Sequence, residues 1–283
     1  MSQSARLNKA GSLGEEDIKQ EQQPSGNIEK FSVSIVSHRH GQLTKGVLNS
    51  LALSHPWIER VWLTHDVPEV EWRPSGDNKW PFDLRVIDNK HSQSFAVNHN
   101  RAFREECKYR LPGVWWWGVI NPDVSWKGDL LSEIRKEVAR LNSNQIGMIY
   151  PAQIDVNGVV QDYERDLPSP RALIRRLVLH KRSLGIDRPP DWINAACMFV
   201  RSDVFHLLGG FDERYRLYVE DVDFCLRLRL AGYAMRRVNC FPVTHMANRA
   251  SRHHWRHAFW HLQGLIRLWL SSSYAEYKKV FFK

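Results

Sequence analysis

The stretch GGFDERYRLYVEDVDFCLRLRLAG, residues 209–232, joins a glycine turn to an amphipathic helix. Apolar side chains recur every fourth residue from Val222 to Leu230, and Gly232 stands where a left-handed cap ends a helix. Acids in a first turn complement the positive end of the helix dipole, and a carboxylate at the lip of a pocket can also act as a general base. Both interpretations stay open here for Glu220, Asp221 and Asp223.

Upstream of this stretch, segments with strand character alternate with segments of helical periodicity. The alternation within residues 31–37 predicts a first strand, and the apolar positions from Leu43 to Leu51 predict the helix after it. This order favours an α/β fold with a Rossmann-like, mostly parallel, doubly wound sheet flanked by helices. Further strands are expected at 60–64, 84–87, 115–120, 146–149 and 195–200.

Polar residues follow the carboxyl ends of several of these strands. The strand at 115–120 must halt before Pro122, because proline cannot continue a central strand, and this leaves Asp123 exposed at a turn. Ligands of open α/β sheets bind in the crevice beyond the carboxyl ends of the strands. That rule gathers Ser37, His38, Asp66, Asn89 and Asp123 around one crevice.

Length and composition bound the domain organisation. The chain has 283 residues, enough for one large α/β domain or two small ones. Residues 1–30 are rich in Ser, Gln, Glu and Gly without periodicity and are expected to form a disordered leader. The α/β domain is expected at 31–250, followed by a basic amphipathic helix at 251–283.

The net charge of +9 is concentrated near the C-terminus, since residues 234–283 hold nine Lys and Arg against Glu276 alone. A local basic patch of this kind argues against a nucleic-acid-binding protein with a broad basic face. The four cysteines form no C-x-x-C pair, which favours a reducing compartment. With no apolar segment resembling a signal peptide or a membrane span, we expect a cytoplasmic protein or one peripheral on the inner face of the cytoplasmic membrane.

The tail carries a second pattern. Apolar residues fall at 4-3-4-3 spacing on one helical face: Trp255, Phe259, Leu262, Ile266 and Trp269. Such a face either docks on the body of the protein or lies on an anionic membrane, and the pattern leaves both open.

Four motifs together resemble the inverting family 2 glycosyltransferases with the GT-A fold. They are Asn121-Pro-Asp-Val124, Gly209-Gly-Phe-Asp-Glu213, Glu220-Asp-Val-Asp223 with Arg227 and Gly232-Tyr233, and Thr244-His-Met246. The Asn98-His-Asn100 segment and Asp191-Trp192 are similar to the bacterial branch of rhamnosyltransferases. The resemblance covers about residues 31–251. Two positions depart from the family pattern: Asn121 replaces the first acid of the D-x-D motif, and Ser94-Phe-Ala96 replaces common glycines.

The resemblance implies a role for each of these positions. Asp123 and His245 would bind Mg²⁺ or Mn²⁺, Asp221 would be the general base, and Asp191, Trp192 and Glu220 would contact the acceptor. The nucleotide is expected at Ser37, His38, Asp66, Asn89, Asn100 and Asn121.

The implied reaction transfers a sugar with inversion from a nucleotide-diphosphate donor to a hydroxyl of a glycan or glycolipid acceptor. The resemblance suggests dTDP-rhamnose as donor and lipopolysaccharide core, O-antigen or a similar cell-surface glycan as acceptor. A UDP-hexose such as UDP-galactose is the alternative donor. A carbohydrate- or nucleotide-binding module without turnover is the alternative of another class, and a nucleic-acid partner is not expected.

Overall fold

The computed structural model describes residues 30–70, 72–74, 80–110, 113–141, 144–170, 189–246 and 255–282. Its centre is a seven-stranded sheet, parallel except at β10, which is antiparallel to both neighbours. The strands lie in the order β11 (Ala234–Arg237), β6 (Ile146–Tyr150), β10 (Cys197–Arg201), β4 (Trp116–Ile120), β1 (Phe31–Ser37), β2 (Ile58–His65) and β3 (Asp83–Asp88). The expected mostly parallel α/β sheet is confirmed. The leader expected at 1–30 lies outside the described residues, apart from Lys30.

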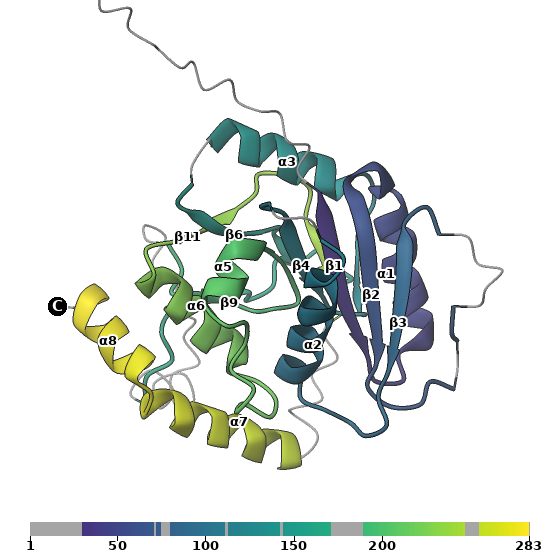
Figure 1. Cartoon of the computed structure of the whole chain (residues 1–283). Helices are drawn as coiled ribbons and strands as arrows, with labels where there is room; N and C mark the ends of the chain where they lie inside the picture. Colours follow the sequence, from purple (N-terminus) through teal and green to yellow (C-terminus); the bar gives the residue numbers. More distant parts are fainter. Residues whose placement is uncertain are drawn as a thin grey trace, which may run out of the picture.

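Helices cover both faces of the sheet (Figure 1). One face carries α1 (Gly41–Ala52), α3 (Leu130–Leu141) and the short 3₁₀ helix η1 (His55–Trp57). The other face carries α2 (Phe95–Cys107), α5 (Ser202–Leu207) and α6 (Glu220–Leu230). Successive residues of a strand point to opposite faces, so that Trp116 packs in one hydrophobic cluster and Trp117 in the other. The five inner strands are thus buried on both sides, whereas the edge strands β3 and β11 are partly exposed.

Two small sheets form beyond the central one. A three-stranded sheet joins β5 (Val124–Ser125), β12 (Val243–His245) and β7 (Gln153–Ile154), and a two-stranded sheet joins β8 (Glu164–Arg165) and β9 (Trp192–Ile193). Within the first, His245 pairs with Val124, the residue after Asp123. This pairing places Asp123 close to His245, which lies 122 positions later in the sequence.

Two helices end the described chain, α7 (Trp255–Trp269) and α8 (Ser272–Phe281); α8 contacts α6, and α7 contacts α8 (Figure 1). Ser271 caps α8 by accepting a hydrogen bond from Tyr274 N–H. The buried face of α7 consists of Gly264, Leu265 and Leu268. Three residues of the apolar face identified in the sequence, Phe259, Leu262 and Ile266, are exposed and point away from the body of the protein. Among the described residues, no helix is long and apolar enough to cross a membrane.

Candidate active site

The carboxyl ends of β1, β2 and β3 meet around one buried carboxylate, that of Asp66, which is 4% exposed. Four side chains and one backbone N–H lie within hydrogen-bond distance of it: His38 Nδ1 (3.0 Å), Asn89 Nδ2 (3.2 Å), Ser92 Oγ (2.6 Å), Asn98 Nδ2 (2.9 Å) and Gln93 N (2.7 Å). Burial alone would raise the pKa of Asp66, but the hydrogen bonds from Gln93, Ser92 and Asn98 lower it below its ordinary value. Asp66 is therefore an anion that ties three loops together.

The structure brings the predicted nucleotide residues Ser37, His38, Asp66 and Asn89 to this rim. Ser37 Oγ donates to Glu69 Oε2 at 2.9 Å and accepts from the His40 N–H, so its hydroxyl holds the loop after β1. The His38 side chain is 58% exposed. Of these four residues it is the one whose side chain offers the most surface to a ligand.

Asn100 serves a different region. Its side-chain amide donates to Phe211 O at 2.8 Å and accepts from Phe211 N at 2.9 Å, which binds α2 to the glycine turn of residues 209–210. Gly210 is required there twice over, because its φ is +71° and a Cβ would lie 2.3 Å from Asn100 Oδ1. The Asn100 amide is thus occupied by the protein, and its contact with nucleotide stays a prediction.

Asp123 and His245 form the predicted metal pair. Asp123 Oδ2 lies 3.5 Å from His245 Nε2. The His245 Nδ1–H donates to Gln161 Oε1 at 3.0 Å, and Gln161 Nε2 donates to His245 O at 2.6 Å. Burial lowers the pKa of His245 and the Asp123 charge only partly opposes this, so the imidazole is neutral at pH 7.

This arrangement fits a cation. With Nδ1 protonated, the Nε2 lone pair faces a carboxylate oxygen, and a positive ion between or beside them removes their repulsion. Two adjacent ligands of a divalent ion, each about 2.1 Å from it, lie about 3 Å apart. The described residues contain no cluster of three or more His, Cys, Asp or Glu side chains suited to a metal, so further ligands must come from other oxygens. Gln161 orients the histidine and had no signal in the sequence, because it lies far from both ligands.

The acids of α6 follow a strained turn. Tyr218 and Val219 adopt φ values of 68° and 73°, which are unusual for residues with a side chain and particularly so for a β-branched one. Glu220 is 5% exposed, and its Oε2 has no hydrogen-bond partner among the described residues. Burial and the neighbouring Asp221 charge raise the pKa of Glu220 to about 8. Asp221 keeps some exposed surface. Burial raises its pKa, although hydrogen bonds from the Val222 and Ala195 backbone oppose the shift.

Residues 195–196 connect the two halves of the site. The backbone of Ala195 contacts the Asp221 carboxylate, and Ala196 O accepts from Asn121 N at 2.8 Å. Asn121 begins the turn that carries Asp123, and its own side chain is partly exposed. The proposed base and the metal pair therefore flank one short segment.

The predicted acceptor residues Asp191 and Trp192 are buried. Asp191 accepts from Leu167 N at 2.7 Å and from Tyr277 OH at 2.8 Å, and pairs with Arg229 at 3.1 Å. Trp192 Nε1 donates to Asp166 O at 2.9 Å. These bonds support the backbone of residues 165–167, and direct contact of either side chain with an acceptor stays a prediction. The Arg165 guanidinium, 4.9 Å from the Trp192 ring, is one of the charges that act on Asp221.

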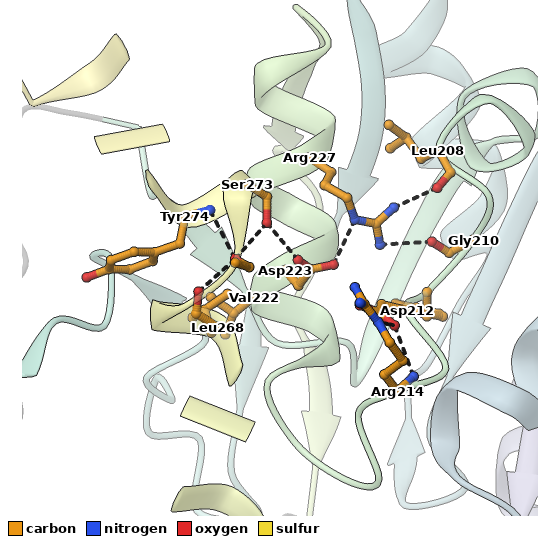
Figure 2. A network of polar contacts seen from close by, with 12 residues as sticks. Leu208, Gly210, Asp212, Arg214, Val222, Asp223, Arg227, Leu268, Ser273 and Tyr274 are labelled. Atoms are coloured by element: carbon orange, nitrogen blue, oxygen red, sulfur yellow. Dashed lines mark hydrogen bonds and ion pairs between the residues drawn. The ribbon is translucent and has the colours of Figure 1, made fainter. Parts of the chain in front are cut away.

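Asp223 has a supporting role, as Figure 2 shows. It pairs with Arg227 at 2.7 Å and accepts from Ser273 Oγ at 3.0 Å. Arg227 also donates to the carbonyls of Leu208 and Gly210. The third acid of the motif thus fixes the glycine turn to α6 and α8, which leaves Glu220 and Asp221 as the acids outside this network.

Comparisons with known proteins identify the family. No family model matches the chain. Rhamnosyltransferase WbbL of Escherichia coli K12 is 38% identical over 187 residues, which are 62% of this chain and 68% of WbbL. The N-acetylglucosaminyl-diphospho-decaprenol L-rhamnosyltransferase of Mycobacterium tuberculosis is 31% identical over 167 residues, so that the match spans 53% of this chain and only 54% of that relative.

Solved structures agree on the fold. The mannosyltransferase PcManGT of Pyrobaculum calidifontis, in complex with GDP-Man and Mn²⁺, superposes with a TM-score of 0.54 at 14% identity, covering 84% of this chain and 64% of that one. TarS of S. aureus gives a TM-score of 0.55 at 13% identity over 88% of this chain and 42% of its own. The α/β sheet with its flanking helices is the fold of these glycosyltransferases, and the sequence relatives place the chain further: it belongs to the family 2 glycosyltransferases, in the rhamnosyltransferase-like branch.

Proposed function

We propose that the protein transfers L-rhamnose from dTDP-rhamnose, with inversion, to a hydroxyl of a lipid-linked precursor of a bacterial cell-surface glycan. The observation that carries the proposal is the placement of Asp221 and the pair Asp123–His245 on either side of residues 195–196. The relatives support the sugar and the acceptor class, since one is named a rhamnosyltransferase and another is named for a diphospho-decaprenol substrate.

In the proposed step, Asp221 accepts the proton of the acceptor hydroxyl. The hydroxyl oxygen attacks the anomeric carbon as the bond from that carbon to the diphosphate oxygen breaks, so the configuration inverts and a nucleoside diphosphate leaves. Burial raises the pKa of Asp221 and thereby makes its carboxylate a stronger base. The neighbouring Glu220, with its pKa of about 8, is protonated at pH 7 and adds no second charge.

Asp123 and His245 would hold Mg²⁺ or Mn²⁺. The ion would offset the charge that develops on the departing diphosphate. Gln161 keeps the His245 Nε2 lone pair directed toward Asp123, so the pair is ready to bind before substrate arrives. The rim around Asp66 would hold the nucleotide, with the exposed His38 as its contact.

The reaction would take place on the cytoplasmic side of the membrane, where nucleotide sugars are made. All four cysteines are free thiols, as a reducing compartment favours.

The test is release of nucleoside diphosphate from dTDP-rhamnose, UDP-galactose, UDP-GlcNAc and GDP-mannose, each with Mg²⁺, Mn²⁺ or EDTA and a lipid-diphosphate sugar acceptor. We expect turnover with dTDP-rhamnose and a metal, and a loss of 10³-fold or more in kcat for Asp221→Asn, which keeps the size but removes the basicity. Asp203→Asn, on an exposed surface, is the matched control. Wild-type turnover by Asp221→Asn would refute the base, and binding of donor without turnover would favour the non-catalytic module.

A further inference from the structure

The outer face of α7 carries an apolar stripe that no described residue covers. Its members are spaced by three, four and four residues and are 57%, 52%, 46% and 82% exposed, in the order Phe259, Leu262, Ile266 and Leu270. On a helix this spacing brings them within one narrow arc. The opposite face, with Gly264, Leu265 and Leu268, is buried against the body. The helix thus has two apolar faces, and the body needs only one of them.

Basic side chains border one edge of this stripe. Arg267 lines the same cleft as Ile266 and Leu270, and Arg214 of this cleft is paired with Asp212 at 2.6 Å. The Arg216 guanidinium stands 4.5 Å from the Trp260 ring centroid, on the same edge. Residues 255–282 contain Glu276 as their one acid. An apolar stripe beside cations complements a membrane surface with anionic headgroups.

The buried face of α7 lies directly on the turn that precedes the catalytic acids. A Cβ on Gly264 would meet Val219 Cγ2 at 3.0 Å and Tyr218 O at 3.2 Å, and Tyr218 OH lies 3.1 Å from His257 Nδ1. Tyr218 and Val219 are the two residues of positive φ that lead into Glu220 and Asp221. The apolar stripe and the proposed base therefore lie on opposite sides of one helix, whose diameter is about 10 Å.

We propose that α7 lies in the plane of an anionic membrane, with Phe259, Leu262, Ile266 and the adjoining Leu270 inserted among the lipids and Arg216 and Arg267 at the headgroups. The orientation would hold Asp221 at the surface where a lipid-linked acceptor presents its sugar, and this purpose rests on the proposed function. A second copy of the chain is the competing occupant. A two-fold contact through this face would place the same arginines of the two copies near each other, without acids on α7 to compensate.

The membrane contact is tested without reference to turnover, by sedimentation of the full chain with vesicles of phosphatidylcholine alone or with 30% phosphatidylglycerol. We expect binding to the anionic vesicles that falls at least tenfold in the double variant Leu262→Gln/Ile266→Gln. Leu53→Gln/Leu207→Gln is the matched control, because its residues are 53% and 65% exposed but lie on α1's C-terminal end and on α5. Arg267→Gln should weaken binding about fivefold and reduce the preference for anionic lipid.

Thermal unfolding and donor binding establish that each variant is folded. Absence of vesicle binding by the wild type, or equal binding by the stripe and control variants, would overturn the proposal. A dimer in the absence of lipid that the stripe variant alone abolishes would assign the face to a second copy instead. If the stripe variant Leu262→Gln/Ile266→Gln loses vesicle binding but keeps full activity on a water-soluble acceptor, the proposal is supported. This result also separates a failure of membrane contact from a failure of the proposed chemistry.

Discussion

The two walls of the candidate active site have opposite electrostatics. On the proposed donor side, Asp66 is buried yet receives enough hydrogen bonds to keep its pKa below the ordinary value. On the proposed acceptor side, Glu220 is as deeply buried, has a carboxylate oxygen without a partner in the described part of the chain, and has a pKa of about 8. Two acids of similar exposure thus differ in charge at pH 7, because Asp66 receives several hydrogen bonds whereas Glu220 is buried beside the charge of Asp221.

The backbone conformation of the two walls also differs. On the Asp66 side Arg39, the residue after His38, has a φ of 61°, whereas Glu220 directly follows two successive residues of positive φ, the second of them β-branched. Strain and an unsatisfied carboxyl persist only where the surrounding structure holds them, and here α7 packs on the strained turn. Hydrogen bonds thus fix the shape of the proposed donor wall. In the proposed acceptor wall, burial raises the pKa of Glu220 and Asp221, as a general base requires.

The largest effect on this contrast is expected from Asp66→Ala. The substitution removes the anion and takes away the Asp66 acceptor of the Asn98 Nδ2, whose side chain is buried. We expect a loss of about 3–5 kcal/mol in the free energy of unfolding, measured by urea denaturation, and a higher KM for donor. Glu133→Ala is the matched control, since the Glu133 side chain is 37% exposed and its ion pair with the exposed Lys136 should contribute less than about 1 kcal/mol. Equal losses in both variants would show that Asp66 has no special role.

The second prediction concerns the pH dependence of Glu220. Its pKa is about 8 in the folded protein and near 4.5 when unfolded, so between these values the folded state holds a proton that the unfolded state has released. Stability therefore falls as pH rises from about 4.5 to 8. Glu220→Gln is neutral at every pH and should be more stable than the wild type by roughly 2–4 kcal/mol at pH 9, and nearly equal to it at pH 5.

Urea denaturation of both proteins at pH 5, 7 and 9 checks this second prediction. Glu133→Gln, a change at an exposed acid on α3, should show no such divergence. A constant difference between wild type and Glu220→Gln across the three pH values would mean that Glu220 keeps its ordinary ionisation.

The sequence predicted the sheet well because hydrophobic alternation and proline stops are local signals. It also suggested Asp123, His245 and Asp221 as site residues, through motifs whose members are close in sequence, and these roles stay predictions. In the structure Asp123 lies beside His245, and the Ala195 backbone contacts Asp221. Three features lay beyond these sequence signals. Gln161 reaches His245 across 84 positions, Arg165 acts on Asp221 from an unpatterned basic segment, and the outward orientation of Phe259 depends on which face of α7 the body accepts. Each is set by tertiary packing, which periodicity in one segment cannot report.

Residues that are equally prominent in the motifs differ in whether their side chains are free to contact a ligand. Asn100 and Asp191 were expected to contact ligands, yet the structure engages both side chains with the protein. A buried polar side chain must find partners, and a motif does not say whether those partners belong to the ligand or to the fold.

Gln161→Leu provides the smallest and most specific test of the contrast, because it acts on the hydrogen bond that orients one metal ligand. Without the Oε1 acceptor, His245 can rotate or protonate at Nε2, and the lone pair facing Asp123 is lost part of the time. We expect Mn²⁺ affinity in the presence of dTDP to fall about 10- to 100-fold, measured by calorimetry, with the free energy of unfolding changed by about 1 kcal/mol. Gln161→Glu, which keeps an acceptor for Nδ1–H, should recover most of the affinity, whereas Gln263→Leu on the exposed side of α7 should leave it unchanged. If Gln161→Leu bound Mn²⁺ as the wild type does, His245 would not be a metal ligand, and the cation would depend on Asp123 and the diphosphate alone.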